Sequence, residues 1–161
     1  MPLTATAEDI LKDLQATLPA TQVSVEAGAL IVPAAELTVV AKFLRDAAVY
    51  ACDYLSNLTA ADYPDRKEID VVYHLYSMAK KQGPVTLKVR LPRDGAMVAS
   101  VTPLWRGAEF QEREVYDLYG VTFTGHPDLR RILMWDEFAG YPMRKDYVDE
   151  DQDAPNASAI R

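Results

Sequence analysis

The sequence predicts an α+β fold: a two-layer sandwich with helices packed on one face of a mixed, largely antiparallel sheet, followed by an extended C-terminal segment. Three observations predict it. The 161 residues suit one globular domain, and 49% of them are hydrophobic, which is enough for a sizeable core. Hydrophobic periodicity gives the order helix–strand–strand–helix–strand–strand–strand. In the middle of the chain, Val, Leu and Tyr alternate with polar residues, as in a sheet with one buried face.

Two helices and a short hairpin are predicted within the first 48 residues. Residues 6–18 carry apolar side chains at helical spacing, and Thr6 is a suitable N-cap residue. Residues 22–26 and 29–32 form two strand-like runs joined by a tight turn. A second helix is expected over 35–48, because its apolar residues again share one face and its charged residues lie on the other.

A run of strands is predicted in the middle of the chain. Turn-forming residues at 60–66 indicate a turn, and the sequence Lys-Lys-Gln-Gly-Pro at 80–84 indicates a hairpin loop. The strands themselves are expected at residues 50–58, 69–78, 85–91 and 96–101.

Charge is distributed unevenly. Lys and Arg number 17 and Asp and Glu 24, a net charge of −7, which argues against nucleic-acid binding as the main function because phosphate backbones require a basic surface. Acids occupy five of the eight positions from 146 to 153. We therefore expect an α+β body at 1–103, a charged helix and an extended segment of the same domain at 104–148, and an acidic, mobile tail at 149–161.

The residues that could bind a metal or a redox group are few. Cys52 is the only cysteine, so it can form neither an internal disulfide nor an iron–sulfur cluster, and we expect a small buried side chain. The two histidines, His74 and His126, are far apart in the sequence. No apolar run reaches the roughly 18–20 residues that span a bilayer, and the first ten residues lack the basic region of a signal peptide.

The most informative charged residues follow Pro103. Residues 105–119 are predicted to form a third helix, which Gly120 ends. Within this helix, Glu109 and Arg113 stand four residues apart in the order that favours an ion pair.

Two further acids of this helix, Glu114 and Asp117, stand three residues apart, a spacing at which like charges mildly disfavour the helix. Asp117 also lies near the C-terminal end, where the helix dipole opposes a negative charge. We expect both carboxylates to pair with cations, either Arg130 and Arg131 or arginines of a partner. The alternative, an ordinary solvated charged face, is left open by the local pattern.

A second alternative is an acid/base site. The residues Glu112, Glu114, Asp117 and His126 bring carboxylates and an imidazole into one stretch, as in some hydrolases and isomerases. The spacing is not specific to any reaction, and no nucleophile elbow, metal motif or phosphate-binding glycine loop accompanies it.

The residues from 112 to 147 form a recognisable pattern. It reads Glu112-Arg113-Glu114, Asp117-Leu118-Tyr119-Gly120, Gly125-His126-Pro127-Asp128-Leu129, Arg130-Arg131-Ile132-Leu133 and, at 140–147, Gly-Tyr-Pro-Met-Arg-Lys-Asp-Tyr. This pattern resembles the signature of the 30 kDa subunit family of respiratory complex I (NADH:quinone oxidoreductase). Two positions depart from it, since Tyr141 stands where many relatives have His and Met143 where Leu is common.

The resemblance implies a peripheral-arm subunit that braces the quinone-site subunits of a proton-pumping enzyme. It implies no catalytic residue, metal or cofactor on this chain, with FMN, iron–sulfur clusters and quinone on other subunits. The implied partners are a hydrogenase-large-subunit-like quinone-site subunit and the subunit that holds the terminal iron–sulfur cluster, at the cytoplasmic face of the cell membrane. The residues expected in interface or structural contacts are Glu112, Arg113, Glu114, Asp117, Gly120, His126, Asp128, Arg130, Arg131, Arg144, Lys145, Asp146 and Tyr147.

Two other functions stay open at this point. A homologous subunit of a membrane-bound hydrogenase, or of a ferredoxin-driven or F420-driven complex, would carry the same motif. A free-standing acid/base enzyme is the other, and turnover by the purified chain alone would support it.

Overall fold

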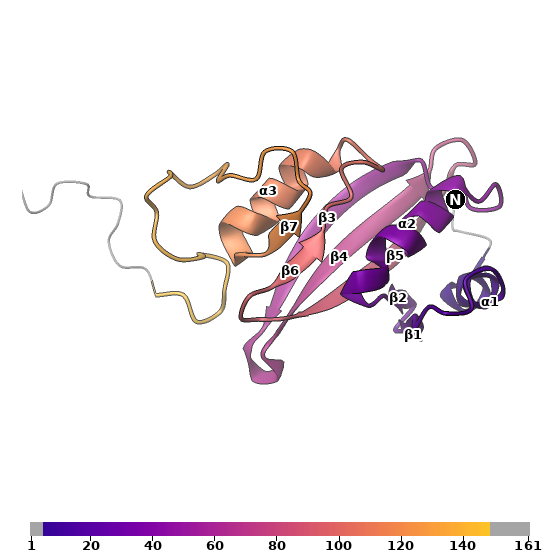
Figure 1. The fold of residues 1–161 in the computed structure, drawn as a ribbon, viewed down its shortest axis with the longest axis horizontal. Coiled ribbons are helices and arrows are strands. Elements are labelled where there is room, and N and C mark those ends of the chain that lie inside the picture. The colour runs from indigo at the N-terminus through magenta and orange to yellow at the C-terminus, as the bar shows by residue number, and fades with distance from the viewer. Residues whose placement is uncertain (1–4, 149–161) are drawn as a thin grey trace, which may run out of the picture.

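The computed structural model describes residues 5–148, in which a five-stranded sheet carries helices on one face and a C-terminal segment extends away from the body (Figure 1). No helix within these residues is long and apolar enough to cross a membrane. The elements in chain order are α1 (Ala7–Thr17), β1 (Ser24–Glu26), β2 (Ala29–Ile31), the 3-10 helix η1 (Ala34–Glu36), α2 (Leu37–Asp46), β3 (Tyr54–Tyr63), the 3-10 helix η2 (Pro64–Arg66), β4 (Glu68–Ser77), β5 (Gln82–Pro92), β6 (Met97–Ala99), α3 (Ala108–Tyr119) and β7 (Thr122–Thr124).

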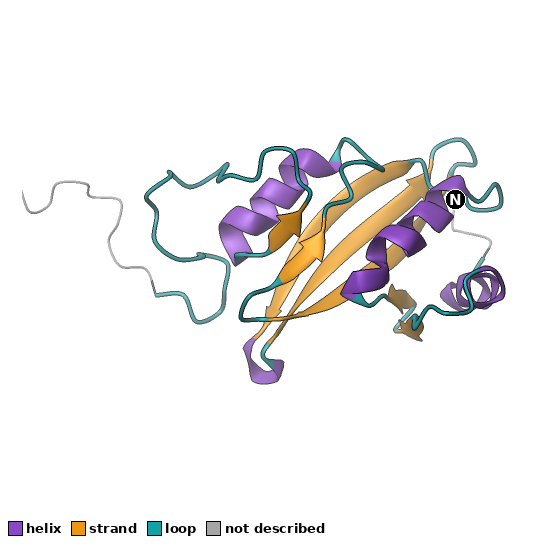
Figure 2. Cartoon of the chain, viewed as in Figure 1, coloured by secondary structure: helices purple, strands orange, loops and turns teal. Residues whose placement is uncertain are grey.

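The sheet is mixed and mostly antiparallel, so the predicted fold class is confirmed. Its strand order is β1-β2-β5-β4-β3, and only the β2–β5 pair is parallel. Alternate residues of β4 and β5 are buried, among them the directly paired Tyr73 and Leu87. Helices α2 and α3 lie on the face to which these side chains point (Figure 2). The period of two in the sequence therefore identified the inner face correctly.

The N-terminal helices form as their patterns predicted. Thr6 and Asp9 make a capping box in which each side chain bonds the backbone N–H of the other residue. Ile10 and Leu14 are buried on the inner face of α1. The predicted second helix is divided between η1 and α2, and the apolar side chains of α2 face the core.

Several sequence-based boundaries in the sheet were wrong, among them the start of β3, which lies at Tyr54 and not at residue 50. The predicted turn at 60–66 is mostly strand, because β3 continues to Tyr63 and keeps Ala60 and Asp62 on its buried face. The turn follows only at Pro64, where proline begins η2. The predicted loop at 80–84 is also shorter than expected, since β5 already begins at Gln82.

The third helix begins later than predicted. Trp105 lies before α3, with its side chain in the core and its indole N–H donating to the carbonyl of Cys52 at 3.0 Å. The predicted end at Gly120 is confirmed, with a left-handed φ of 75°. A Cβ on this glycine would lie 2.6 Å from the ring of Tyr141, so the position is also sterically restricted.

Strands β6 and β7 pair in parallel as a separate two-stranded sheet beside α3. Residues 125–148, named the C-terminal segment from here on, contain no further helix or strand. The segment runs along the end of α3 and then beyond the sheet (Figure 1). The acidic tail predicted at 149–161 lies outside the described residues.

Candidate functional site

The carboxylate of Asp117 holds the first part of the C-terminal segment. Asp117 is fully buried on α3. One carboxylate oxygen accepts the backbone N–H groups of Ile132, Leu133 and Met134 at 3.0, 2.7 and 2.9 Å. The other accepts a bond from Arg131 at 2.6 Å. Burial alone would raise the pKa of this carboxyl, but the bonds from these donors lower the pKa below its ordinary value.

The guanidinium of Arg131 extends this contact to the next turn of the segment. It donates to the backbone carbonyls of Asp117, Phe138 and Gly140 at 2.9, 3.0 and 3.1 Å. It also lies over the rings of Phe138 and Tyr141. Arg131 therefore ties three parts of the chain together, and the predicted pairing of Asp117 with an arginine of this chain is found.

Arg113 contributes a second set of bonds from α3. Its guanidinium donates to the backbone carbonyls of Arg130 and Arg131 at 3.2 and 3.0 Å. The predicted ion pair with Glu109 does not form, because Arg113 is turned towards these carbonyls and buried by the segment. Arg113 thus serves tertiary packing rather than the helix surface.

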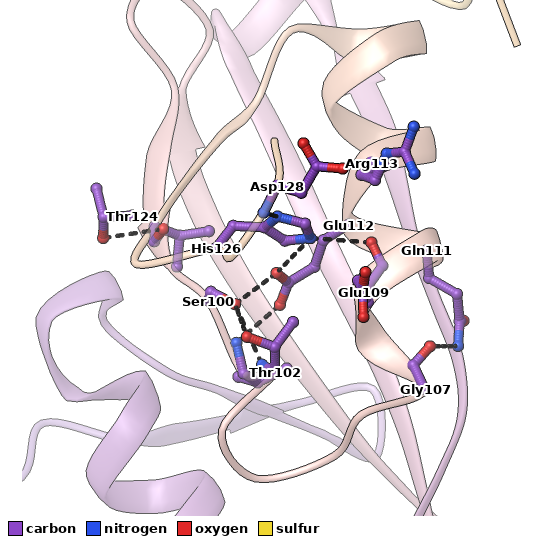
Figure 3. A network of polar contacts seen from close by, with 12 residues as sticks. Ser100, Thr102, Gly107, Glu109, Gln111, Glu112, Arg113, Thr124, His126 and Asp128 are labelled. Atoms are coloured by element: carbon purple, nitrogen blue, oxygen red, sulfur yellow. Dashed lines mark hydrogen bonds and ion pairs between the residues drawn. The ribbon is translucent and has the colours of Figure 1, made fainter. Parts of the chain in front are cut away.

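A buried polar network surrounds Glu112 (Figure 3). One carboxylate oxygen accepts the hydroxyl of Ser100 at 2.6 Å, and the other accepts the backbone N–H of Val101 at 2.7 Å. His126 Nε2 lies 3.9 Å from the first oxygen. Burial raises the pKa of Glu112 above its ordinary value, although these contacts partly oppose the rise.

His126 fastens the start of the C-terminal segment to α3. Its Nδ1 accepts the backbone N–H of Asp128 at 3.0 Å, which places the proton of a neutral ring on Nε2. Nε2 then donates to the carbonyl of Glu109 at 2.9 Å. Both ring nitrogens are therefore engaged with backbone, and the side chain is fully buried.

The end of the segment is held by a second carboxylate, that of Asp62. Arg93 donates to Asp62 at 2.7 Å and also bonds Asp146 of the segment. The backbone N–H of Lys145 donates to Asp62 at 2.8 Å. The guanidinium of Arg93 is the main cause that lowers the pKa of Asp62. Arg144 adds a bond from its Nε to the carbonyl of Tyr119 at 2.7 Å.

Some predicted site residues are not brought into these contacts. Glu114 is exposed and makes no ion pair with any residue from 5 to 148, so it does not pair with Arg130 or Arg131, and the alternative of an arginine on a partner stays a prediction. Arg130 instead pairs with Asp128 at the surface, at 2.8 Å. Glu114 and Asp117 differ because, of these two acids, only Asp117 faces the segment that covers α3.

Sequence reasoning missed three contributors, Ser100, Asp62 and Arg93. Asp62 could have been noticed, because it stands at a core-facing position of β3 where a carboxylate needs partners. Ser100 and Arg93 lie in connections, and their sequence context carries no such signal.

The arrangement is suited to holding backbone rather than to acid/base chemistry on a substrate. Glu112, Asp117 and the His126 side chain are all fully buried and directed at neighbouring backbone groups or at Ser100. Cys52 is also buried, and burial raises the pKa of its thiol to about 11. Across residues 5–148, no group of three or more His, Cys, Asp or Glu side chains could hold a metal ion.

Comparison with known proteins identifies the family. Residues 30–153 match the family described as "Respiratory-chain NADH dehydrogenase, 30 Kd subunit". The chain belongs to this family. It is 42% identical to a subunit of the NADH-quinone oxidoreductase of Moorella thermoacetica over 87% of this chain and 94% of that protein. It is 43% identical to the corresponding NADH-quinone oxidoreductase subunit of Chlorobium phaeobacteroides, but the match covers only 65% of that protein.

Two solved structures share the fold. One is described as the membrane-bound sulfane sulfur reductase, an archaeal respiratory membrane complex. A chain of that complex matches with a TM-score of 0.72 and 25% sequence identity, and the match covers 96% of this chain and 92% of the matched chain. The other, described as a trypsin-resistant fragment of Nqo5, matches with a TM-score of 0.55 and 30% identity over 76% of this chain and 98% of the fragment. The α+β body described above therefore occurs in both.

Proposed function

We propose that this chain is a structural subunit of a proton-pumping NADH-quinone oxidoreductase and braces the subunits that form the quinone site. The observation that carries the proposal is that charged residues of the family pattern make buried contacts within the chain. Asp117 and Arg131, central to the family pattern, form buried contacts that hold the C-terminal segment on the body. Glu112, also in the pattern, binds Ser100 and Val101 in the connection before α3. A subunit that positions its neighbours needs such a fixed segment, since a preformed surface loses less entropy on binding.

We also propose that this chain carries no redox group. An iron–sulfur cluster needs several thiolates, and the chain has one cysteine, which is buried. We expect the purified chain to be colourless and to contain no stoichiometric iron or zinc. An absorption spectrum and elemental analysis test this, and flavin or cluster bands would contradict it.

The proposed partners are the quinone-site subunits of the complex, one similar to the hydrogenase large subunit and one holding the terminal iron–sulfur cluster. The names of the relatives support membership of such a complex. Association with the membrane would then be through these partners, at its cytoplasmic face.

A pair of neighbouring substitutions tests the structural role. Arg131→Ala removes the ion that faces buried Asp117, whereas Arg130→Ala removes a guanidinium that is 67% exposed. We expect Arg131→Ala to lower the amount of assembled complex and Arg130→Ala to leave it near the wild-type amount. NADH-driven quinone reduction, normalised to assembled complex, should be unchanged in both. Full assembly with a tenfold loss of turnover in Arg131→Ala would refute the structural role.

A second candidate is a subunit of a related respiratory complex with another electron donor or acceptor. The match to the sulfane sulfur reductase chain favours it, because it covers 96% of this chain with the higher of the two TM-scores. Purification of the native complex through this chain, followed by assays with NADH and quinone and with reduced ferredoxin and a polysulfide, separates the two. Activity with the second pair alone would select the related complex.

A further inference from the structure

The neutral ring of His126 holds the first turn of the C-terminal segment through a bond that a charged ring could not make. Its Nδ1 accepts the backbone N–H of Asp128 at 3.0 Å, and its Nε2–H donates to the carbonyl of Glu109 at 2.9 Å (Figure 3). An imidazolium carries a proton on both nitrogens and accepts no hydrogen bond. Protonation would therefore set the Nδ1–H of the ring against the N–H of Asp128, while the bond from Nε2 to Glu109 is kept.

A counterion for a charged ring is already in place on the other side of the imidazole. The carboxylate of Glu112 lies 3.9 Å from Nε2, and both side chains are fully buried. The two oxygens of this carboxylate accept the hydroxyl of Ser100 and the backbone N–H of Val101, which fix its position. A proton on the ring is thus stabilised from the side of Nε2 and opposed only at Nδ1.

Charged groups of both signs face the ring from the elements packed against it. Strand β7 and residues 100–102 carry none. The hydroxyl of Tyr73 on β4 lies near Glu112 and stays uncharged, because burial raises its pKa well above the ordinary value. The charged side chains on α3, on the connection before it and on the segment itself are Glu109, Glu112, Arg113, Arg106, Asp128 and Arg130. Among these described acids, Glu112 alone forms an ion-pair contact with the ring, so it is the counterion that the fold provides.

The carboxylate of Asp128 is placed to accept a bond from a charged Nδ1. It belongs to the residue whose N–H the neutral ring binds, and it is 51% exposed in an ion pair with Arg130. The pKa of Asp128 is lowered mainly by Arg130, and the charge of His126 contributes, so ring and carboxylate are close. Since exposed ion pairs hold their partners weakly, this carboxylate can turn from Arg130 to the ring.

We propose that His126 is a pH-sensitive latch between α3 and the C-terminal segment. The neutral ring holds the backbone N–H of Asp128. When Nδ1 takes a proton from solvent, the ring releases that N–H and donates to the Asp128 carboxylate, which leaves Arg130. Histidine suits such a device, because it is the side chain whose charge ordinarily changes between pH 5 and pH 8. All of these contacts lie within this chain, so the latch does not depend on the proposed function.

The release is confined to the first turn of the segment. The later part is held by Asp117, which accepts the N–H groups of residues 132–134, and by Asp62, which accepts that of Lys145. The pKa values of both carboxyls are lowered below their ordinary values, so both carboxylates stay charged between pH 5 and pH 8. In this range only residues 126–129 should loosen.

NMR spectroscopy of the purified, 15N-labelled full chain between pH 8 and pH 5 tests the latch. The ring 15N resonances show which nitrogen of His126 carries a proton, and hydrogen exchange, relative to the intrinsic rate at each pH, shows how often the Asp128 amide opens. At pH 8 we expect a proton on Nε2 alone. As the pH falls, Nδ1 should gain a proton and the Asp128 amide should exchange at least about tenfold faster over the same range, with constant relative exchange at 130–147.

Three variants separate the latch from a general effect of acid. His126→Asn places an amide oxygen where Nδ1 stands, and this oxygen can accept the same N–H but takes no proton, so the pH dependence at Asp128 should disappear. His74→Asn is the matched control at the other histidine, on β4, and should leave that pH dependence unchanged. Asp128→Asn removes the anion that binds the charged ring, so Nδ1 should take its proton at lower pH than in wild type.

Several outcomes would overturn the latch. A proton on Nδ1 at pH 8 would show the other tautomer, and a ring that stays neutral down to pH 5 would show no switch. Protonation of the ring without faster exchange at Asp128 would show that the bond does not depend on the charge. A pH step that persists in His126→Asn, or an equal acceleration at residues 130–147, would assign the opening to another group. In Asp128→Asn, an unchanged pH of ring protonation would exclude the carboxylate as the new acceptor.

Discussion

Replacing Asp117 with Asn removes the charge on which four hydrogen bonds converge, one from Arg131 and three from backbone N–H groups. An amide has one acceptor atom and one donor group. If its oxygen faces the three N–H groups, its NH2 faces the guanidinium; if it is reversed, its NH2 faces the three N–H groups. Either orientation sets donor against donor.

The magnitude follows from burial. The Asp117 side chain is 0% exposed and that of Arg131 15%, so the substitution leaves a mostly buried cation without its counterion. Removing one partner of such a pair costs about 3–5 kcal/mol. Because about 1.4 kcal/mol is a factor of ten, local opening should become about 10²- to 10⁴-fold more frequent, or the segment should remain open.

Hydrogen exchange measured by mass spectrometry detects this opening. In Asp117→Asn, we expect faster exchange at Ile132, Leu133 and Met134, with unchanged exchange in β4 and β5, whose ladder hydrogen bonds do not involve the segment. Asp128→Asn is the control, since it also removes an arginine-paired carboxylate but at the surface. Exchange at 132–134 within about threefold of wild type would refute the reasoning, as would an equal effect of the control.

Two further outcomes are expected. The pKa values of Asp117 and Asp62 are lower in the folded chain than in the unfolded chain. Their contribution to holding the segment is therefore present above the unfolded pKa of about 3.9 and is lost as the pH falls through the lower folded values. Hydrogen exchange of residues 130–147, relative to the intrinsic rate at each pH, should accelerate below pH ~4, and acceleration that starts near neutral pH would contradict this. Gly120→Ala should lower the free energy of unfolding, measured in urea, by about 1–3 kcal/mol more than Gly95→Ala does. Both glycines have a positive φ, but only at Gly120 would the added Cβ meet a side chain, that of Tyr141. Equal losses of stability would show that Tyr141 moves aside freely.

Local sequence patterns predicted most of the fold. The helices and the inner face of the sheet depend on periodicity and caps within short windows, and these gave the correct elements and fold class. The end of β3 was misplaced because Ala60 and Asp62 are poor strand formers by propensity. Pairing with β4 and burial against the helices keep them extended, and neither is visible in a short window.

The candidate site was predicted less completely. The motif residues were named, but two acids that looked equivalent differ in burial, since Asp117 is fully buried and Glu114 is exposed. Which of them is buried depends on where a segment 14 or more residues later crosses the helix. Asp62 and Arg93 were missed because they meet Lys145 and Asp146 across more than 50 residues.

The sequence by itself determined the family, the helix and strand pattern, and the presence of a single cysteine, because these depend on residue identity and local spacing. Only the tertiary structure decided that the motif charges bind the chain's own backbone and that Leu133 and Trp135 are exposed. The physical reason is range. A hydrogen bond or ion pair forms between groups within a few ångströms in space, and the fold, not the order of residues, brings a carboxylate of α3 to the N–H groups of a later segment.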